Sequence, residues 1–253
     1  MTQRVQYGLS VILLGLACQG DTLYDVPDPE GPGASGSNRA PSAQLSVEPQ
    51  GIMAPVQGRL RLTCSDPDGD QVIHILGYTG STSNDVQSAA PIDLTHSFVQ
   101  AVVIRGSCID SRGAASSPIS RQLVVVNGDL QRDSVLLLTN AARSAAGVQS
   151  LVQDSRLTAL AVAHARDMAE RGYFSHTTPE GKTFSDRLRE AGVSGSAGEN
   201  IAGNSSAGGA VQAWLNSSGH RANMVNSTFR RLGAGVYRTL QSPYTYYVQV
   251  FTN

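Results

Sequence analysis

Hydrophobic periodicity changes near residue 130, and this change constrains the fold more than any other feature of the sequence. Before it, short runs alternate apolar and polar residues, as residues 60–64 (Leu-Arg-Leu-Thr-Cys) do. After it, apolar residues recur at helical spacing, as along residues 157–168. Alternation is typical of strands with one buried face, and the longer period is typical of amphipathic helices. We therefore predict two domains, an all-β sandwich over residues 43–127 and an α+β domain over residues 131–253.

The N-terminus has the pattern of an export signal. Arg4 is followed by an apolar run over residues 9–17, which is too short for a transmembrane helix of about 20 residues. The run ends in Leu-Gly-Leu-Ala-Cys, which resembles a bacterial lipobox. We predict a lipoprotein-type signal peptide over residues 1–18, with Cys18 lipidated and the protein anchored in the bacterial cell envelope. The alternative is an ordinary signal peptide and a secreted protein.

Residues 19–42 are rich in Gly, Ser and Pro, and large apolar side chains are scarce there. Such a segment cannot bury enough surface to fold, so we predict a flexible linker. The whole chain of 253 residues has 19 Lys and Arg against 20 Asp and Glu, a net charge of −1. Because nucleic-acid binding needs clustered basic residues, we expect no nucleic-acid partner.

The segment over residues 43–127 carries two cysteines near strand ends. In an exported chain we predict that Cys64 and Cys108 form a disulfide, and two free thiols are the alternative. Asp-Pro-Asp-Gly-Asp over residues 66–70 could offer alternating ligands to Ca²⁺. We interpret it as a turn, since turn residues explain it without a metal. This turn and the cysteine pair loosely resemble bacterial Ig-like and PKD-type extracellular modules.

The C-terminal half carries three distinctive blocks of residues. They are Gly-Tyr-Phe-Ser-His-Thr-Thr-Pro over residues 172–179, Ala-Gly-Glu-Asn-Ile-Ala over residues 197–202, and Trp-Leu-Asn-Ser-Ser-Gly-His-Arg-Ala-Asn over residues 214–223. In this order the blocks resemble the CAP superfamily of cysteine-rich secretory proteins, antigen 5 and pathogenesis-related 1 proteins, and in particular its bacterial SCP-like branch. Asn140 and Arg143 fit the resemblance, which covers about residues 135–253.

The resemblance implies an α-β-α sandwich with a central groove. In the family, the His of the first block and the Glu of the second face this groove and can hold a divalent metal, often Zn²⁺. In bacterial members the His of the third block also lies at the groove. Carried over to this sequence, the groove and metal-binding residues are His176, Glu199 and His220. Two imidazoles and one carboxylate are a reasonable ligand set for Zn²⁺.

The sequence departs from the family at positions that supply metal ligands. Many members have a second Glu shortly after the Trp, and no acidic residue follows Trp214 closely here. They also place a His on the last strand, where this chain has Tyr246. Binding of Zn²⁺ or another divalent cation would therefore depend on His220. Three further residues are predicted to support the ligands by hydrogen bonds: Asp186, Asn200 and Asn223.

Three classes of function remain open. The one we favour is an exported protein that binds a small molecule, a lipid or an envelope component in the His/Glu groove, with or without a divalent metal. The second is a metal-dependent hydrolase of a peptide or envelope polymer, although the sequence has neither a His-Glu-x-x-His helix nor a Gly-x-Ser-x-Gly elbow. The third is a surface adhesion or structural protein. Because we favour binding over catalysis, we assign no catalytic residue.

Overall fold

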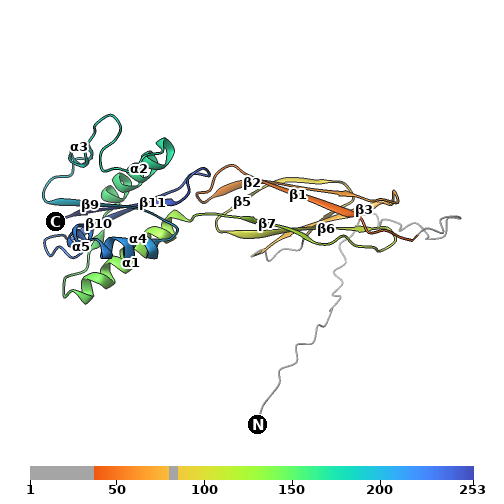
Figure 1. The fold of residues 1–253 in the computed structure, drawn as a ribbon, viewed down its shortest axis with the longest axis horizontal. Coiled ribbons are helices and arrows are strands. Elements are labelled where there is room, and N and C mark those ends of the chain that lie inside the picture. Colours follow the sequence, from red (N-terminus) through yellow and green to blue (C-terminus); the bar gives the residue numbers. More distant parts are fainter. Residues whose placement is uncertain (1–36, 80–84) are drawn as a thin grey trace, which may run out of the picture. The chain divides into compact units, whose positions relative to one another are not determined.

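The computed structural model describes residues 37–79 and 85–253. The predicted signal peptide, Cys18 and most of the predicted linker lie outside these residues. In order along the chain, strands occupy the first part of the described chain, and helices and strands together occupy the second (Figure 1). No helix among the described residues is long and apolar enough to cross a membrane.

The strands of the first part form two antiparallel sheets. They are β1 (Ser42–Pro49), β2 (Val56–Ser65), β3 (Val72–Tyr78), β4 (Val86–Ser88), β5 (Ile92–Phe98), β6 (Val102–Asp110) and β7 (Ile119–Leu123). The order is β1-β2-β5 in one sheet and β4-β3-β6-β7 in the other. Inward residues of both, such as Leu60 and Ile104, share one core. The chain thus has the predicted pair of packed sheets, and its Ig-like or PKD-type identity stays a prediction.

The predicted disulfide is confirmed. Cys64 of β2 and Cys108 of β6 are bonded, with their Cα atoms 6.0 Å apart, so the bond joins one sheet to the other. The strand pattern differs from the prediction at one place, because alternation along residues 97–108 indicates a single strand. In the structure β5 ends at Phe98 and β6 begins at Val102, in a different sheet. Alternation alone does not show where a chain crosses between sheets.

The second part is a three-layered α-β-α structure, as the resemblance implies. Its helices are α1 (Gly128–Ala145), α2 (Ser155–Arg171), α3 (Phe184–Glu190), α4 (Ala207–Asn216) and α5 (Ser218–Met224). Its strands are β8 (Val152–Gln153), β9 (Ala197–Asn204), β10 (Arg231–Tyr237) and β11 (Thr245–Thr252). They form one sheet in the order β8-β10-β11-β9, with α2 and α3 on one face and α1, α4 and α5 on the other (Figure 1).

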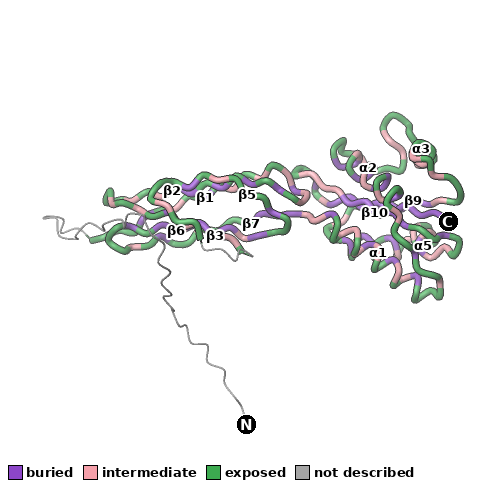
Figure 2. Tube along the Cα trace, turned by 180° about the vertical axis from the view of Figure 1, so that it is seen from behind, coloured by how far each residue is buried: buried purple, intermediate pink, exposed green. Residues whose placement is uncertain are grey.

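Each face of this sheet has its own hydrophobic core. Trp214 of α4 and Phe251 of β11 belong to the core under α1, α4 and α5, and Met168 belongs to the core under α2. Two glycines of β10 let α2 approach the sheet closely, since a β-carbon at Gly233 or Gly235 would collide with the α2 backbone. Buried residues are accordingly concentrated along the central strands, and the outer faces of the helices are exposed (Figure 2).

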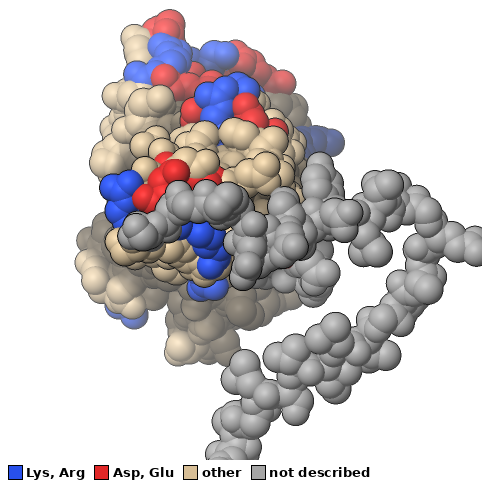
Figure 3. Space-filling model, turned by 90° about the vertical axis from the view of Figure 1, so that its right-hand side faces the viewer, with Lys and Arg blue, Asp and Glu red and all other residues tan. Residues whose placement is uncertain are grey.

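Local signals set the helix ends. The side chain of Asn127 caps α1 by accepting a hydrogen bond from the backbone nitrogen of Leu130. Thr183 and Asp186 form a capping box at the start of α3. On the face drawn in Figure 3, Lys and Arg lie beside Asp and Glu, in keeping with the net charge of −1.

Candidate functional site

Two of the predicted site residues are in direct contact. His176 lies in the loop between α2 and α3, and Glu199 lies on β9. The Nδ1 atom of His176 donates a hydrogen bond to Oε1 of Glu199, at 2.8 Å. The His176 side chain is 48% exposed, whereas the Glu199 side chain is only 2% exposed. The pair therefore consists of a buried carboxylate that orients an imidazole at the protein surface.

Arg187 of α3 completes this cluster, and the sequence analysis missed it. Its Nη1 atom lies 2.7 Å from Oε2 of Glu199, and its Nη2 atom lies 3.0 Å from Oε1. The Nη2 atom also donates to the backbone oxygen of His176, at 2.7 Å. The guanidinium thus binds both oxygens of the carboxylate and fixes the loop that carries His176. No family motif or ligand spacing in the sequence marks this arginine.

The ion pair determines the charge of the carboxylate. Burial raises the pKa of a carboxyl group, but hydrogen bonds from His176 and Arg187 outweigh burial, so the pKa of Glu199 lies below its ordinary value. Glu199 is therefore ionised at neutral pH and can only accept hydrogen bonds. It follows that Nδ1 of His176 carries a proton, and that Nε2 is free to accept a hydrogen bond when the imidazole is neutral.

The third predicted residue, His220, lies on α5 and is partly buried. Burial lowers the pKa of His220, and the charge of His176 lowers it further. Among the described residues no hydrogen bond joins the His220 side chain to His176 or Glu199, so its place at the groove stays a prediction. The backbone oxygen of His220 accepts a hydrogen bond from Nδ2 of Asn200, at 3.0 Å, so β9 holds the start of α5 in place.

A series of hydrogen bonds between buried amide side chains lies next to the site. Asn223 donates to Oδ1 of Asn200 at 2.9 Å, and Asn200 donates to Oε1 of Gln249 at 3.0 Å. Gln249 in turn donates to Oγ1 of Thr139 at 2.7 Å. Asn200 and Asn223 thus lie beside the site, as predicted. Asp186 instead accepts hydrogen bonds from Thr183 and Arg189 within α3, and the structure gives it no bond to His176 or Glu199.

Aromatic side chains surround the loop that carries His176. Phe174 is 47% exposed, and its ring centroid lies 6.4 Å from that of Tyr244 and 6.3 Å from that of Tyr246. Tyr246 lies at the position where the resemblance predicts a histidine in many family members. Burial, together with the neighbouring Tyr244, raises the pKa of Tyr246 to about 12. Tyr246 is therefore neutral at physiological pH, and it is buried against Phe174.

A cavity of about 550 Å³ lies between α2, α3 and the loop that joins them. Arg187 and His164 line it, so it adjoins the His176–Glu199–Arg187 cluster. Burial lowers the pKa of His164, whose Nε2 atom lies 3.0 Å from the backbone oxygen of Ser175. The apolar lining consists of Ala159, Leu160, Ala163 and Ala191. The rest of the lining is mostly charged and includes two ion pairs, Arg171 with Glu180 and Lys182 with Glu190.

The predicted metal ligands do not form a three-ligand site as they stand. Both oxygens of Glu199 already accept hydrogen bonds from Arg187. Among the described residues, the ligand atoms of three or more His, Cys, Asp or Glu side chains lie within 4.8 Å of one another only at Asp66, Asp70 and Asp110. A metal ion at Glu199 would have to share the carboxylate oxygens with Arg187 and His176.

Comparisons with known proteins identify the family of the C-terminal part. The family model for CAP, the cysteine-rich secretory protein family, matches residues 136–251. The uncharacterized membrane protein YlbC of Bacillus subtilis (strain 168) is 42% identical over 119 residues, which are 46% of this chain and 33% of that protein. The uncharacterized protein YkwD of the same organism is 40% identical over 103 residues, which are 40% of each chain. The match thus spans well under half the length of either relative.

Among solved structures, the chain is similar to an extracellular protein containing a SCP domain from Bacillus anthracis str. Ames. The two are 19% identical with a TM-score of 0.47, and the similarity covers 83% of this chain and 85% of that one. The family model matches the α-β-α part of the chain. The three sequence blocks lie in the same part. Residues 136–251, just under half of this chain, are therefore a CAP domain.

Proposed function

We propose that this chain is an exported CAP-domain protein that binds an amphiphilic small molecule or lipid of the cell envelope beside His176. The observation that carries the proposal is the double hydrogen bond from Arg187 to Glu199. It neutralises the buried carboxylate and makes it a fixed support for His176. The exposed imidazole is then held in one orientation, with Nε2 available to the polar end of a ligand.

Binding is favoured over catalysis for a physical reason. A general acid or base works best when its pKa lies near the operating pH, and the pKa of Glu199 is lowered away from neutrality. In the described part of the chain, no Ser, Thr or Cys side chain is hydrogen-bonded to His176, so the pair does not activate a nucleophile. What the cluster offers is a rigid polar contact beside an aromatic surface.

The surroundings of the cluster suit a ligand with an apolar body and a polar head. Phe174 exposes nearly half of its surface in the loop that carries His176. The adjoining cavity of about 550 Å³ is lined by four apolar side chains together with charged ones, and its volume lies in the range of about 300–1,000 Å³ that small-molecule sites occupy. An acyl chain against the alanines would leave its head group near Arg187.

The test is binding of a fluorescent fatty acid to the full chain. We expect saturable binding that Ala163→Trp weakens at least tenfold, because Ala163 is an exposed residue of α2 that lines the cavity. His176→Ala should weaken it as well. Arg189→Ala is the matched control, since Arg189 lies on α3 but contacts only Asp186 and is 74% exposed. Equal affinity of the wild type and Ala163→Trp would refute the cavity as the binding site.

A divalent metal at His176, Glu199 and His220 is the second candidate. Its support is that the Nε2 atom of His176 has no hydrogen-bonding partner among the described residues and that the charge of His176 acts on His220. This candidate requires Arg187 to release Glu199. Zinc or another divalent cation would then polarise a bound carbonyl or water, which is also the requirement of the hydrolase alternative.

Export and anchoring are proposed from the N-terminal sequence. Lipidation of Cys18 would hold the protein at a membrane of the cell envelope, with residues 19–42 as a spacer. Cys18→Ser should move the protein from the detergent-soluble membrane fraction to the culture medium or periplasm. A variant still found in the membrane fraction would contradict lipidation as the anchor. The full-length wild type, processed in the same cells, is the reference.

A further inference from the structure

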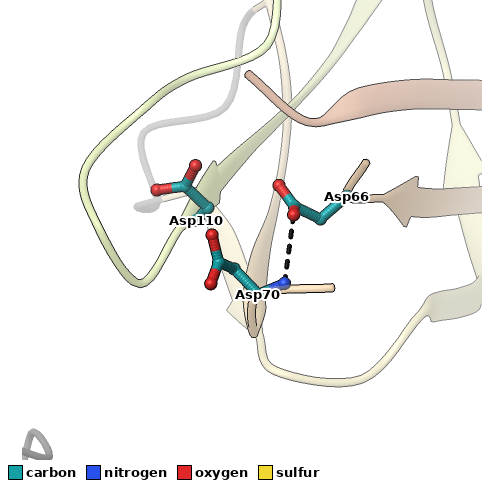
Figure 4. A group of neighbouring side chains, drawn as sticks. All are labelled: Asp66, Asp70 and Asp110. Atoms are coloured by element: carbon teal, nitrogen blue, oxygen red, sulfur yellow. Dashed lines mark hydrogen bonds between the residues drawn. The ribbon is translucent and has the colours of Figure 1, made fainter. Parts of the chain in front are cut away.

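A cluster of three aspartates lies in the β-sandwich, where the connection between β2 and β3 meets the end of β6. Asp66 follows β2, Asp70 precedes β3, and Asp110 is the last residue of β6. One carboxylate oxygen of each lies within 4.8 Å of the other two (Figure 4). The turn interpretation of the Asp-Pro-Asp-Gly-Asp segment did not include Asp110, because only the pairing of β3 with β6 places it there.

The turns explain only half of the carboxylate oxygens. Oδ1 of Asp66 accepts hydrogen bonds from the backbone nitrogens of Asp68 and Asp70, at 2.8 and 3.0 Å. Oδ1 of Asp110 accepts from those of Arg112 and Ala114, at 2.9 and 2.8 Å. In Asp66 and in Asp110, Oδ1 therefore stabilises the local turn, and Oδ2 takes no part in it.

The remaining oxygens are buried and have no hydrogen-bond donor. Oδ2 of Asp66 and Oδ2 of Asp110 are both inaccessible to solvent and accept no hydrogen bond from the described residues. Asp110 is only 5% exposed as a whole residue. A buried carboxylate oxygen without a donor is unfavourable unless a cation stands near it. Two such oxygens in one cluster point to a bound cation.

The charge of the surroundings agrees with this. Four carboxylates, those of the three residues and of Asp68, meet two guanidinium groups, which leaves a net charge of −2. Arg39 and Arg112 both bind Asp68, and Arg112 also binds Asp70, at 2.6 Å. Asp68 is thus occupied by arginines, whereas Asp66 and Asp110 have no ion pair within the described chain. One divalent cation would neutralise the cluster.

We propose that Asp66, Asp70 and Asp110 bind one Ca²⁺ ion. Ca²⁺ accepts six to eight oxygens at about 2.3–2.6 Å, so two of its ligands can be about 4.8 Å apart across the ion, while Mg²⁺ requires shorter distances. Carboxylate oxygens are its preferred ligands. The ion would join β2 of one sheet to β3 and β6 of the other, two residues beyond each cysteine of the disulfide.

The test is calorimetric titration of the full chain with CaCl₂ after dialysis against EDTA. We expect one ion per chain, with a dissociation constant on the order of 10⁻⁴–10⁻³ M, as is usual for extracellular Ca²⁺ modules. Asp110→Asn should weaken binding at least tenfold. Asp70→Asn is a second variant, at a less buried position, which keeps the test valid if Asp110→Asn does not fold.

Two controls separate this site from the rest of the molecule. Asp93→Asn removes an exposed carboxylate of β5 that pairs with Arg59 and Arg61, and it should bind Ca²⁺ like the wild type. Glu199→Gln, in the CAP domain, should also bind normally. Absence of binding to the wild type at about 10 mM CaCl₂, well above the range expected for such modules, would overturn the proposal. So would unchanged affinity in both Asp110→Asn and Asp70→Asn.

Discussion

The two domains of this chain differ in how the oxygens of their buried carboxylates are hydrogen-bonded. In the CAP domain, both oxygens of Glu199 accept hydrogen bonds from Arg187, and one of them also accepts from His176. In the sandwich, Asp66 and Asp110 each use one oxygen in a turn and leave the other buried without a donor. Glu199 of the first cluster is therefore paired with an arginine, whereas Asp66 and Asp110 of the second have no ion pair among the described residues.

Metal binding at His176, Glu199 and His220 stays a prediction, and Ca²⁺ binding in the sandwich is our proposal. The histidines and the glutamate of the CAP domain look like a metal site because of their residue types. The aspartates of the sandwich look like a turn because they are close in sequence. Residue types do not show whether a neighbouring arginine already neutralises a carboxylate, and the structure does. Arg187 is the residue that neutralises Glu199, so substitutions of Arg187 test the contrast between the two clusters.

The largest effect is expected from Arg187→Leu. It leaves the Glu199 carboxylate buried, with His176 as its remaining charged partner, and removal of one partner from a buried ion pair costs about 3–5 kcal/mol. The free energy of unfolding of the CAP domain can be measured separately, because the single tryptophan, Trp214, lies in its core. Urea unfolding followed by Trp214 fluorescence should therefore show the loss.

Arg189→Ala is the control for this measurement. Arg189 lies on the same helix as Arg187, but its side chain is exposed and its contact with Asp186 is solvent-accessible. Exposed ion pairs contribute little to stability. If Arg187→Leu unfolds at the same urea concentration as Arg189→Ala, Arg187 does not neutralise Glu199 in solution, and the comparison between the two clusters fails.

Much of the fold could be predicted from the sequence, because it depends on local patterns. The periodicity change near residue 130 separates the two parts, and Thr183 with Asp186 marks the start of α3. The disulfide follows from the export signal and the cysteine count. The resemblance also places His176 and Glu199 in one site, where the structure has them in contact.

The missed features depend on tertiary contacts. Arg187 looks like any charged residue of a short helix, and only the fold brings it to β9. Arg143 fits the family resemblance, but the sequence does not reveal its role. It is fully buried and donates to four backbone oxygens: those of Gln149, Met224, Asn226 and Phe229. Asp110 likewise joins Asp66 and Asp70 only through the pairing of strands.

A smaller effect is expected from Zn²⁺ in the CAP domain. Because Arg187 competes for Glu199, Zn²⁺ should change the unfolding midpoint of the wild type little and should raise that of Arg187→Leu. The gain would be about 2.7 kcal/mol at a hundredfold excess over the dissociation constant. Fluorescence of Trp214 during thermal unfolding, with Zn²⁺ and with EDTA, measures it.

His176→Ala in the Arg187→Leu background is the control for the zinc measurement, since it removes an imidazole ligand and should abolish the gain. Stabilisation of the wild type by Zn²⁺ that His176→Ala abolishes would contradict the competition and would favour the metal candidate. Ca²⁺ should have no such effect on the fluorescence of Trp214. Its proposed ligands all lie in the sandwich, and Trp214 is in the core of the CAP domain.

The smallest effect is the pH dependence of the CAP domain, and its sign follows from His164 and His220. Burial is the main cause that lowers the pKa of both residues in the folded protein. The unfolded chain therefore binds more protons than the folded one below a pH of about 6.5, and stability must fall as the pH decreases through that range. Each histidine contributes at most about 1.4 kcal/mol per pH unit.

Urea midpoints from Trp214 fluorescence at pH 7.5 and 5.5 measure this loss. Glu199 acts in the same direction but at lower pH: its pKa is lowered, so its contribution is lost only below the ordinary carboxyl range. His164→Gln keeps a donor for the backbone oxygen of Ser175 and removes the titrating group. It should therefore flatten the dependence between pH 7.5 and 5.5. A midpoint that rises on acidification, or a slope unchanged in His164→Gln, would show that the buried imidazole is not neutral in the folded protein.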